Sequence, residues 1–295
     1  IGTALFHRGR KRFKMRKTMG GRRMAESAIR RVGIAGLGRM GLRIARRLTA
    51  AGFETAGCDP SPDARAAAEA AGIAVAETPA ALAARSDLLI LAVGFERHCD
   101  AVLFGPDGAA GAEGLVVAVA ATVEPAYVRA LPARAPALAF LDAPLARGEA
   151  AAERGDLLMF AGGDAALLER CRPAFATFAS EIHLLGGLGA GQVGKAANNF
   201  LLWTNVAATV EAYAFAEAQG VEREALREAL LRSSGANWAM ETRAEARPAL
   251  WAEKDMAALL AEADRARVAL PVAGAVREAV KAHKIRMGFP MPEET

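Results

Sequence analysis

The chain is poor in residues that form disulfides or bind metal ions. It has three widely spaced cysteines, Cys58, Cys99 and Cys171, and no Cys-x-x-Cys pair. An odd cysteine count argues against a disulfide framework and fits a reducing compartment, so we expect a cytoplasmic protein. The four histidines lack the spacing of metal ligands, and we expect no metal site.

Long hydrophobic runs are also absent. The most apolar stretch, residues 196–215, contains Asn198, Asn199, Asn205 and Glu211, which favours a buried helix over a membrane span. Hydrophobic residues make up 53% of the chain and charged residues 24%, as in ordinary globular proteins. We therefore expect a folded chain with no membrane partner.

Acidic residues are missing from residues 1–23. This segment carries nine Lys or Arg, and removing those nine charges from the net charge of +4 leaves −5 for the rest of the chain. The basic character thus belongs to a tail rather than to the folded body. We expect residues 1–30 to form a basic, disordered extension without function; targeting and nucleic-acid binding are the alternatives.

Short β runs alternate with helical stretches between residues 31 and 187. Most of the β runs are almost continuously apolar, as in strands that are covered on both faces. This alternation predicts an α/β fold, a Rossmann-type doubly wound parallel sheet, for residues 31–187. The predicted strands cover residues 32–35, 54–58, 87–92, 115–119, 138–142, 157–161 and 182–185.

The pattern changes at the glycine-rich residues 186–189. Beyond them we find no good strand and predict an all-helical C-terminal domain, residues 188–295, for substrate binding and dimerisation. Its long first helix is apolar on too many faces for one subunit, so we expect a homo-oligomer, a dimer or tetramer. The predicted helices cover residues 192–219, 223–233, 254–267 and 272–283.

A glycine-rich turn, Gly36-Leu37-Gly38-Arg39-Met40-Gly41, follows the first predicted strand and opens a helix. In this context the three glycines allow a tight turn, close approach of a pyrophosphate, and close helix–strand packing. The helix N-terminus offers free N–H groups to phosphates. We therefore predict a dinucleotide site at these residues.

An acid, Asp59, follows the second predicted strand, 18 residues after Gly41. It is expected to accept hydrogen bonds from the adenosine ribose and to repel a 2′-phosphate, which favours NAD over NADP. Arg39 and Arg65 keep NADP possible. We also place Val93 and Gly94, which follow another predicted strand, among the cofactor-binding residues.

Lys195 and Asn199 are four residues apart on the predicted long helix and share one face. Apolar neighbours would lower the pKa of the lysine, so that it could act as a general acid or base near neutral pH. Asn199 could then orient the reacting oxygen. The alternative is a solvated lysine beside a packing asparagine.

Five motifs together resemble the β-hydroxyacid dehydrogenase family, of which 3-hydroxyisobutyrate dehydrogenase is the best-known type. The resemblance covers about residues 31–290. Its motifs are the glycine-rich turn, Ala121-Thr122-Val123-Glu124-Pro125, Leu141-Asp142-Ala143-Pro144, the run from Gly191 to Asn199, and Lys254-Asp255-Met256.

The resemblance implies roles for several residues. Lys195 would be the catalytic acid/base and Asn199 would orient the substrate. Thr122 would lie against the nicotinamide, and Lys254 would meet the substrate or cofactor from the helical domain. Trp238 would line the pocket, although a core tryptophan is equally compatible with its sequence context.

The loop after Asp142 departs from the family pattern, because it reads Leu-Ala-Arg-Gly where the family has Val-Ser-Gly-Gly. We predict that Arg147 replaces the serine as the anchor of a substrate anion, with Gly148 supplying a backbone N–H. The alternative is an arginine that points into solvent.

These observations predict an oxidoreductase that transfers a hydride between NAD(H) and a small 3-hydroxy acid or the corresponding aldehyde acid. Two alternatives stay open: an NADPH-dependent short-chain aldehyde or imine reductase of the same fold, and a non-catalytic dinucleotide sensor. Lys195 favours carbonyl chemistry over imines, because imine reductases that resemble this fold generally lack this lysine.

Overall fold

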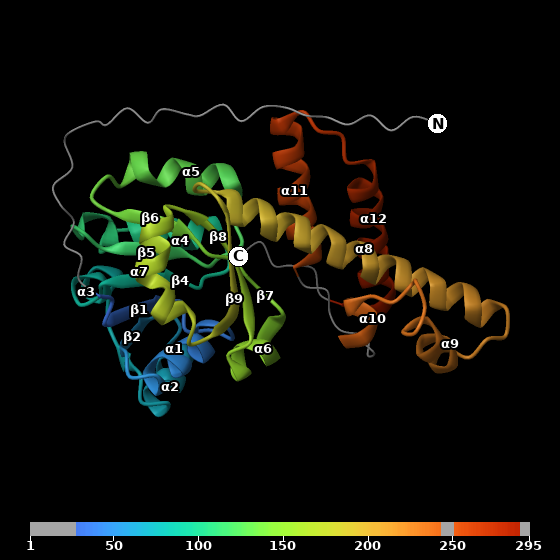
Figure 1. Cartoon of the computed structure of the whole chain (residues 1–295), viewed down its shortest axis with the longest axis horizontal. Coiled ribbons are helices and arrows are strands. Elements are labelled where there is room, and N and C mark those ends of the chain that lie inside the picture. The colour runs from blue at the N-terminus through green and yellow to red at the C-terminus, as the bar shows by residue number, and fades with distance from the viewer. Residues whose placement is uncertain (1–27, 243–250, 290–295) are drawn as a thin grey trace.

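The structure, a computed structural model, describes residues 28–242 and 251–289. The basic tail predicted at residues 1–30 lies almost wholly outside these residues. The described part comprises a nine-stranded sheet with helices on both faces, followed by an array of helices (Figure 1).

The sheet has the order β3-β2-β1-β4-β5-β6-β8-β7, with β9 paired to β8. Strands β1 to β6 run parallel; β8 runs antiparallel to β6 and β7 and parallel to β9. The strands are β1 Arg31–Ala35, β2 Glu54–Cys58, β3 Ala74–Val75, β4 Leu88–Leu91, β5 Val116–Val119, β6 Ala139–Asp142, β7 Leu145–Ala146, β8 Leu157–Gly163 and β9 Ala179–Gly186.

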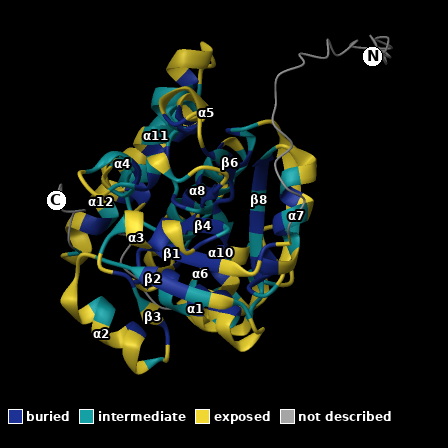
Figure 2. Ribbon diagram, turned by 90° about the vertical axis from the view of Figure 1, so that its left-hand side faces the viewer, coloured by how far each residue is buried: buried dark blue, intermediate teal, exposed yellow. Residues whose placement is uncertain are grey.

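Alternate side chains of the central strands enter two separate cores, which explains why these strands are apolar throughout. Leu88 and Ile90 of β4 pack on one face, and Leu89 and Leu91 pack on the other. Figure 2 shows these strands as a buried layer between helices with exposed outer faces.

Different helices cover the two faces. The Ile90 side contacts α1 (Gly41–Ala50), α2 (Pro62–Ala70), α6 (Gly148–Arg154) and α7 (Ala165–Phe175). The Leu89 side contacts α3 (Pro79–Ala84), α4 (Glu96–Phe104), the short 3-10 turn η1 (Ala109–Gly111) and α5 (Pro125–Arg134).

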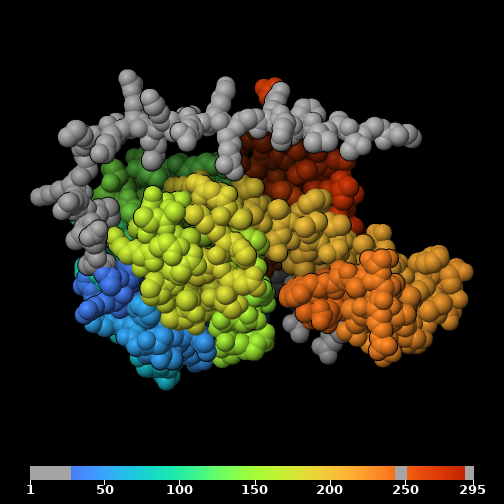
Figure 3. Space-filling model, viewed as in Figure 1, coloured from blue at the N-terminus to red at the C-terminus, as the bar shows by residue number. Residues whose placement is uncertain are grey.

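The helical part is built on α8, Ala190–Ala218, whose 29 residues span about 44 Å at 1.5 Å per residue. Its first turns pack on β8 and β9, and its remainder carries the other helices (Figure 1). In the space-filling view this part projects from the sheet domain (Figure 3). The other helices are α9 Arg223–Leu230, α10 Trp238–Thr242, α11 Ala252–Ala266 and α12 Pro271–Met287.

The predicted fold class is confirmed, with small additions. All seven predicted strands are present, and the structure adds the two-residue strands β3 and β7 and the short helix α10. These three elements are too short to leave a periodic signal in a sequence. Among the described residues, no helix combines the length and the apolar character needed to cross a membrane.

Candidate active site

The glycine-rich turn has the backbone geometry that its residues require. Gly36 has φ +93°, and a Cβ there would lie 2.7 Å from the Ala92 carbonyl oxygen. A Cβ on Gly41 would lie 1.8 Å from the Gly36 oxygen, so α1 can start this close to β1 only with glycine at this position. Gly38 faces open space, with no atom within 4 Å of a Cβ. A ligand can therefore approach the Gly38 backbone closely.

The start of α1 presents backbone N–H groups without a side-chain cap. Met40 is the N-cap residue and makes no side-chain cap, and the first turn has no acid. Leu37 is buried, whereas Arg39 is exposed and pairs with Glu149 of α6 at 2.6 Å. Free N–H groups at a helix N-terminus form a site for phosphate.

Asp59 organises the loop after β2. Its Oδ2 accepts a hydrogen bond from the Leu37 N–H at 2.7 Å, and its Oδ1 accepts one from Ser61 N–H at 2.8 Å. Arg65 donates to the carbonyl oxygens of Asp59 and Pro60, each at 2.9 Å. Asp59 thus links the C-terminal end of β2 to the glycine-rich turn. The glycine-rich turn, the N-terminus of α1 and the carboxylate of Asp59 together form a cradle that fits a dinucleotide.

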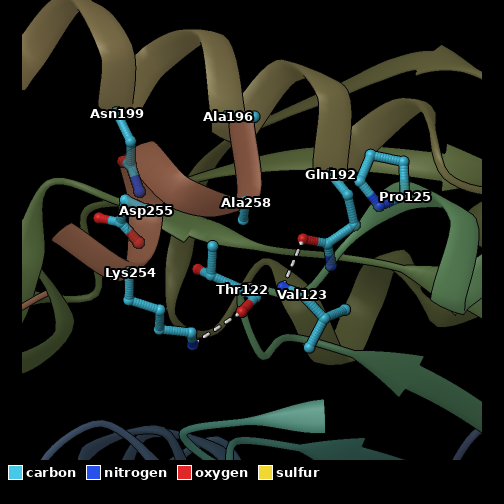
Figure 4. Close-up of a pocket in the computed structure, with 9 residues that line it drawn as sticks. All are labelled: Thr122, Val123, Pro125, Gln192, Ala196, Asn199, Lys254, Asp255 and Ala258. Atoms are coloured by element: carbon cyan, nitrogen blue, oxygen red, sulfur yellow. Dashed lines mark hydrogen bonds between the residues drawn. The ribbon is translucent and has the colours of Figure 1, made fainter. Parts of the chain in front are cut away.

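Lys254 connects the helical part to the ends of β4 and β5. Its Nζ donates to the Gly94 carbonyl at 2.5 Å. The same Nζ donates to the Thr122 carbonyl at 3.0 Å, as Figure 4 shows. The ammonium also lies 4.5 Å from the centre of the Phe95 ring. Burial lowers the pKa of Lys254. The structure therefore brings Lys254, Thr122 and Gly94 together, and Val93 precedes this contact.

The loop that carries Thr122 is fixed to α8 by Gln192. The Oε1 atom of Gln192 accepts a hydrogen bond from the Val123 N–H at 3.2 Å, and Nε2 donates to the Ala121 carbonyl at 2.9 Å. This side chain is almost completely buried. Gln192 stands within the Gly191–Asn199 motif, but its partners on the sheet are 69 and 71 residues away, so its role becomes evident only in the structure.

Asp142 holds the start of α8. This fully buried carboxylate accepts hydrogen bonds from the Gly189 N–H at 2.9 Å and the Gln192 N–H at 2.8 Å. Burial raises the pKa of Asp142, and these hydrogen bonds oppose the rise. Asp142 therefore caps the helix that carries Lys195, a role that its position in a substrate-loop motif did not suggest.

Asn199 of α8 hydrogen-bonds Asp255 in the first turn of α11, and Lys195 lies one helical turn before Asn199. Burial lowers the pKa of Lys195, and the charge of Asp255 opposes this shift. Burial raises the pKa of Asp255. The hydrogen bond from the Trp203 indole, at 3.0 Å, the charges of Lys195 and Lys254, and the hydrogen bond with Asn199 oppose that rise. The structure thus brings a carboxylate and an amide together at the site. Lys195 is half-buried, lies outside the lining of the pocket described next and interacts with Asp255 through charge.

A small pocket lies beside this group. Asn199 and Asp255 point toward one another at one end, and Gln192 and Val123 lie at the other (Figure 4). Asp255 and Trp203 were missed by the sequence analysis, although Asp255 stands in the Lys-Asp-Met motif. The lining residues are Thr122, Val123, Pro125, Gln192, Ala196, Asn199, Lys254, Asp255 and Ala258.

Arg147 and Trp238 lie in other surroundings. The Arg147 guanidinium hydrogen-bonds Asp156 and Ser180 and forms an ion pair with Glu181 at the start of β8 and β9. Its backbone has φ +81°, in the left-handed region, and Gly148 follows with φ +76°. Trp238 begins α10 and is 46% exposed, so it is neither a core tryptophan nor a lining residue of the described pocket.

Two family models together match almost all of the described chain. Residues 31–187 match the NAD binding domain of 6-phosphogluconate dehydrogenase. Residues 189–289 match the family described as NAD-binding of NADP-dependent 3-hydroxyisobutyrate dehydrogenase. The two matches correspond to the sheet and to the helical array.

Curated relatives and solved structures agree. L-threonate dehydrogenase of Cupriavidus necator is 36% identical over 220 residues, which cover 72% of this chain and 74% of that protein. NAD-dependent L-serine dehydrogenase of Pseudomonas aeruginosa is 36% identical over 217 residues, covering 72% and 73%. The crystal structure of 3-hydroxyisobutyrate dehydrogenase from Salmonella typhimurium has a TM-score of 0.78 and 28% identity, covering 88% of this chain and 95% of that one.

These findings confirm the resemblance and the predicted cofactor, NAD, with NADP present among similar structures. The chain belongs to the β-hydroxyacid dehydrogenase family and is an NAD(P)-dependent oxidoreductase that acts on the hydroxyl group of a hydroxy acid.

Proposed function

We propose that this enzyme oxidises a small polar hydroxy acid with NAD⁺ and that Lys195 is the general base. The observation that carries the proposal is the position of Lys195 on α8, one helical turn before the buried Asn199 that lines the pocket, with burial and the charge of Asp255 acting on its amine. A lysine with a lowered pKa is neutral over a larger part of the physiological pH range, so it can accept a proton.

Each residue of this group has a distinct part in the proposed reaction. Neutral Lys195 takes the proton of the substrate hydroxyl, and the Asn199 amide donates a hydrogen bond to the same oxygen. Asp255 stabilises the ammonium that forms, because opposite charges attract strongly where water is excluded. NAD⁺, when bound, supplies the hydride acceptor. In the reverse direction, protonated Lys195 returns its proton to the carbonyl oxygen.

Asp59 supports a preference for NAD over NADP. Both of its carboxylate oxygens are already oriented by backbone N–H groups, which leaves lone pairs on each for ribose hydroxyls. A 2′-phosphate would meet this negative charge. The guanidinium of Arg65 is held beside Asp59 by hydrogen bonds to two carbonyls. Its remaining N–H groups could donate to a 2′-phosphate, and in that alternative the site would admit NADP.

The substrate class follows from relatives and from the polar groups of the site. L-threonate dehydrogenase and L-serine dehydrogenase are named for acids with a hydroxyl or amine beside the carboxylate. A second polar group of this kind could be bound by Asp255. We therefore propose C3 to C5 hydroxy acids with an additional polar substituent, and the related aldehyde acids.

The role of Arg147 in holding the substrate anion stays a prediction, with Gly148 as its backbone partner. It requires that Asp156 and Glu181 release the guanidinium when substrate binds. Arg147→Gly removes the charge and suits the left-handed backbone. An anion anchor predicts a KM for the hydroxy acid raised about 100-fold, the value of a strong charged hydrogen bond. An unchanged KM would show that Arg147 only stabilises its loop. Lys254 would then be the cationic side chain proposed to bind the substrate anion.

We also propose that a second copy covers the outer face of α8. Leu201 is 60% exposed and Phe215 is 71% exposed on this helix, and Val193 adds to the same apolar surface. Burial of such side chains drives association. Light scattering should give at least a dimer, and a strictly monomeric protein would contradict this.

The thiols of Cys58, Cys99 and Cys171 are free, which supports a reducing compartment such as the cytoplasm.

A substrate panel tests the proposed function. C3 to C5 hydroxy acids, aldehyde acids and sulfonates are assayed with NAD(H) and NADP(H), beside Lys195→Ala and Lys281→Ala. Loss of a general acid or base lowers kcat by about 100- to 10,000-fold, whereas the exposed Lys281 of α12 serves as the matched control.

Each alternative predicts a different result of this panel. A non-catalytic sensor binds NAD without turnover. A reductase alternative shows a strong preference for NADPH with aldehydes or imines. The similar imine reductase from Myxococcus stipitatus, at 19% identity and a TM-score of 0.63, shares the fold. Full activity of the Lys195→Ala variant would refute the proposed mechanism.

A further inference from the structure

A buried ion pair joins α12 to the first turn of α11. Lys284 is fully buried, and its Nζ lies 2.5 Å from Oε2 of Glu253, whose side chain is only 12% exposed. Lys284 comes from the last turn of α12 and Glu253 from the first turn of α11. This pair lies outside the pocket lining, and the proposed reaction does not use it.

The three consecutive residues at the start of α11 reach three different parts of the molecule. Glu253 binds Lys284 of α12, Lys254 binds the carbonyls at Gly94 and Thr122, and Asp255 accepts the hydrogen bond of Trp203 on α8. Successive helical residues point about 100° apart, so one turn can make all three contacts. A rotation of this turn that moved one side chain would move the other two.

Within the described residues, the start of α11 lacks a side-chain cap, and the ring of Trp251 packs edge-on against Phe95, with the ring centroids 5.6 Å apart. Trp251, its N-cap residue, makes no side-chain hydrogen bond to the helix. The position of the first turn therefore depends on long-range contacts. The Glu253 contact is directional and buried, whereas an apolar contact at the same place would tolerate sliding and rotation.

We propose that Lys284, acting through Glu253, is a positioning residue that fixes the first turn of α11 and thereby places Lys254 and Asp255 at the reaction site. This proposal rests on the proposed function for its effect on turnover. A buried ion pair commonly stabilises a fold no better than apolar side chains of similar volume, so stability alone does not explain it. A displacement of about 1 Å at a reacting group can lower the rate about 100-fold.

The test replaces both charges by apolar side chains of similar length. The double variant Glu253→Met/Lys284→Met leaves no unpaired charge, so its thermal midpoint should stay close to that of the wild type. The rates are divided by the concentration of NADH-binding sites, so that only folded enzyme is counted. Positioning predicts that kcat/KM for L-threonate or L-serine with NAD⁺ then falls about 10- to 100-fold. Lys281→Met, in the exposed pair with Glu278 on the same helix, should leave both quantities unchanged.

The conservative variant Glu253→Gln distinguishes a displaced first turn of α11 from a less stable fold as the cause of lower kcat/KM. It keeps the side-chain length and an oxygen that accepts the hydrogen bond from Lys284, so it should retain more kcat/KM than the double variant, even where it is less stable. The proposal is overturned if the double variant is as active as the wild type. Activity that simply follows the thermal midpoint through all the variants overturns it as well.

A crystal structure of the double variant gives a readout that does not depend on turnover. If the wild type turns over neither acid, the proposed function fails for these substrates while the positioning role is still decided by geometry. Loss of the 2.5 Å contact from Lys254 to Gly94 or of the 3.0 Å contact from Trp203 to Asp255 supports the proposal. Retention of both contacts overturns it.

Discussion

Replacement of Gln192 by methionine should weaken the link between the sheet and α8. Two well-formed hydrogen bonds are lost, from the Val123 N–H at 3.2 Å and to the Ala121 carbonyl at 2.9 Å. The contact to the Val119 carbonyl, at 3.5 Å, is too long to add much. Because Gln192 is only 1% exposed, water cannot take the place of its amide.

The magnitude follows from the two backbone groups that lose their partner. Each costs about 1–3 kcal/mol when it is buried without a hydrogen bond. Burial of the methionine side chain returns about 1 kcal/mol. The free energy of unfolding should therefore fall by about 1–5 kcal/mol.

Urea unfolding followed by circular dichroism measures this loss, with Gln219→Met at the exposed C-cap of α8 as the control. The control should change stability by less than about 0.5 kcal/mol. Since Thr122 lies between the two tethered residues, kcat/KM should fall at least about tenfold in the Gln192 variant. A Gln192→Met protein within about 0.5 kcal/mol of the wild type would refute the reasoning, because the Val123 and Ala121 groups would then have other partners.

Four further predictions concern the cofactor cradle and the proposed proton-transfer group. Gly41→Ala brings a Cβ to 1.8 Å from the Gly36 oxygen, so the start of α1 must move away from the glycine-rich turn. The Kd for NADH, measured by fluorescence titration, should therefore rise at least about tenfold. An unchanged Kd would refute the close approach of helix and turn. The proposed oxidation requires neutral Lys195, whose pKa is lowered by burial, so kcat/KM should rise with pH to a plateau below the ordinary lysine value of about 10.4. Asp255→Asn should move this rise to lower pH, because the carboxylate opposes the lowering; a shift to higher pH would contradict the assignment. Trp203→Phe keeps the ring but removes a hydrogen bond worth about 1.5–3 kcal/mol, so kcat/KM should fall about 10- to 100-fold, and wild-type kcat/KM would exclude this role.

The sequence contains the parts of the site that local spacing determines. Gly36 and Gly41 are separated by the length of one turn, and the structure shows a close contact between them that only glycine permits. Lys195 and Asn199 share a helix face because they are four residues apart. Such relations depend on chain geometry over a few residues, which is why the cradle and the shared face could be predicted.

Long-range contacts explain what the sequence analysis missed. Asp255 is 52 residues from Trp203 in the chain, so its hydrogen bond exists only once α11 packs on α8. Arg147 shows the converse. Its sequence context suggests a free guanidinium in a substrate loop, yet the sheet brings it to Glu181, which is 34 residues away. Charge pairing at this distance cannot be predicted from a motif.

The two helices that carry the proposed reacting groups, α8 and α11, are each held at the turn that carries those groups. The start of α8 is fixed to the sheet by Asp142 and Gln192, a few residues before Lys195. The start of α11 is fixed by its contacts with α12, α8 and the ends of β4 and β5. The far ends of both helices can therefore adapt to a partner or a crossing helix without moving the site. Substitutions should affect catalysis according to which of these first turns they loosen, rather than according to their distance from the substrate.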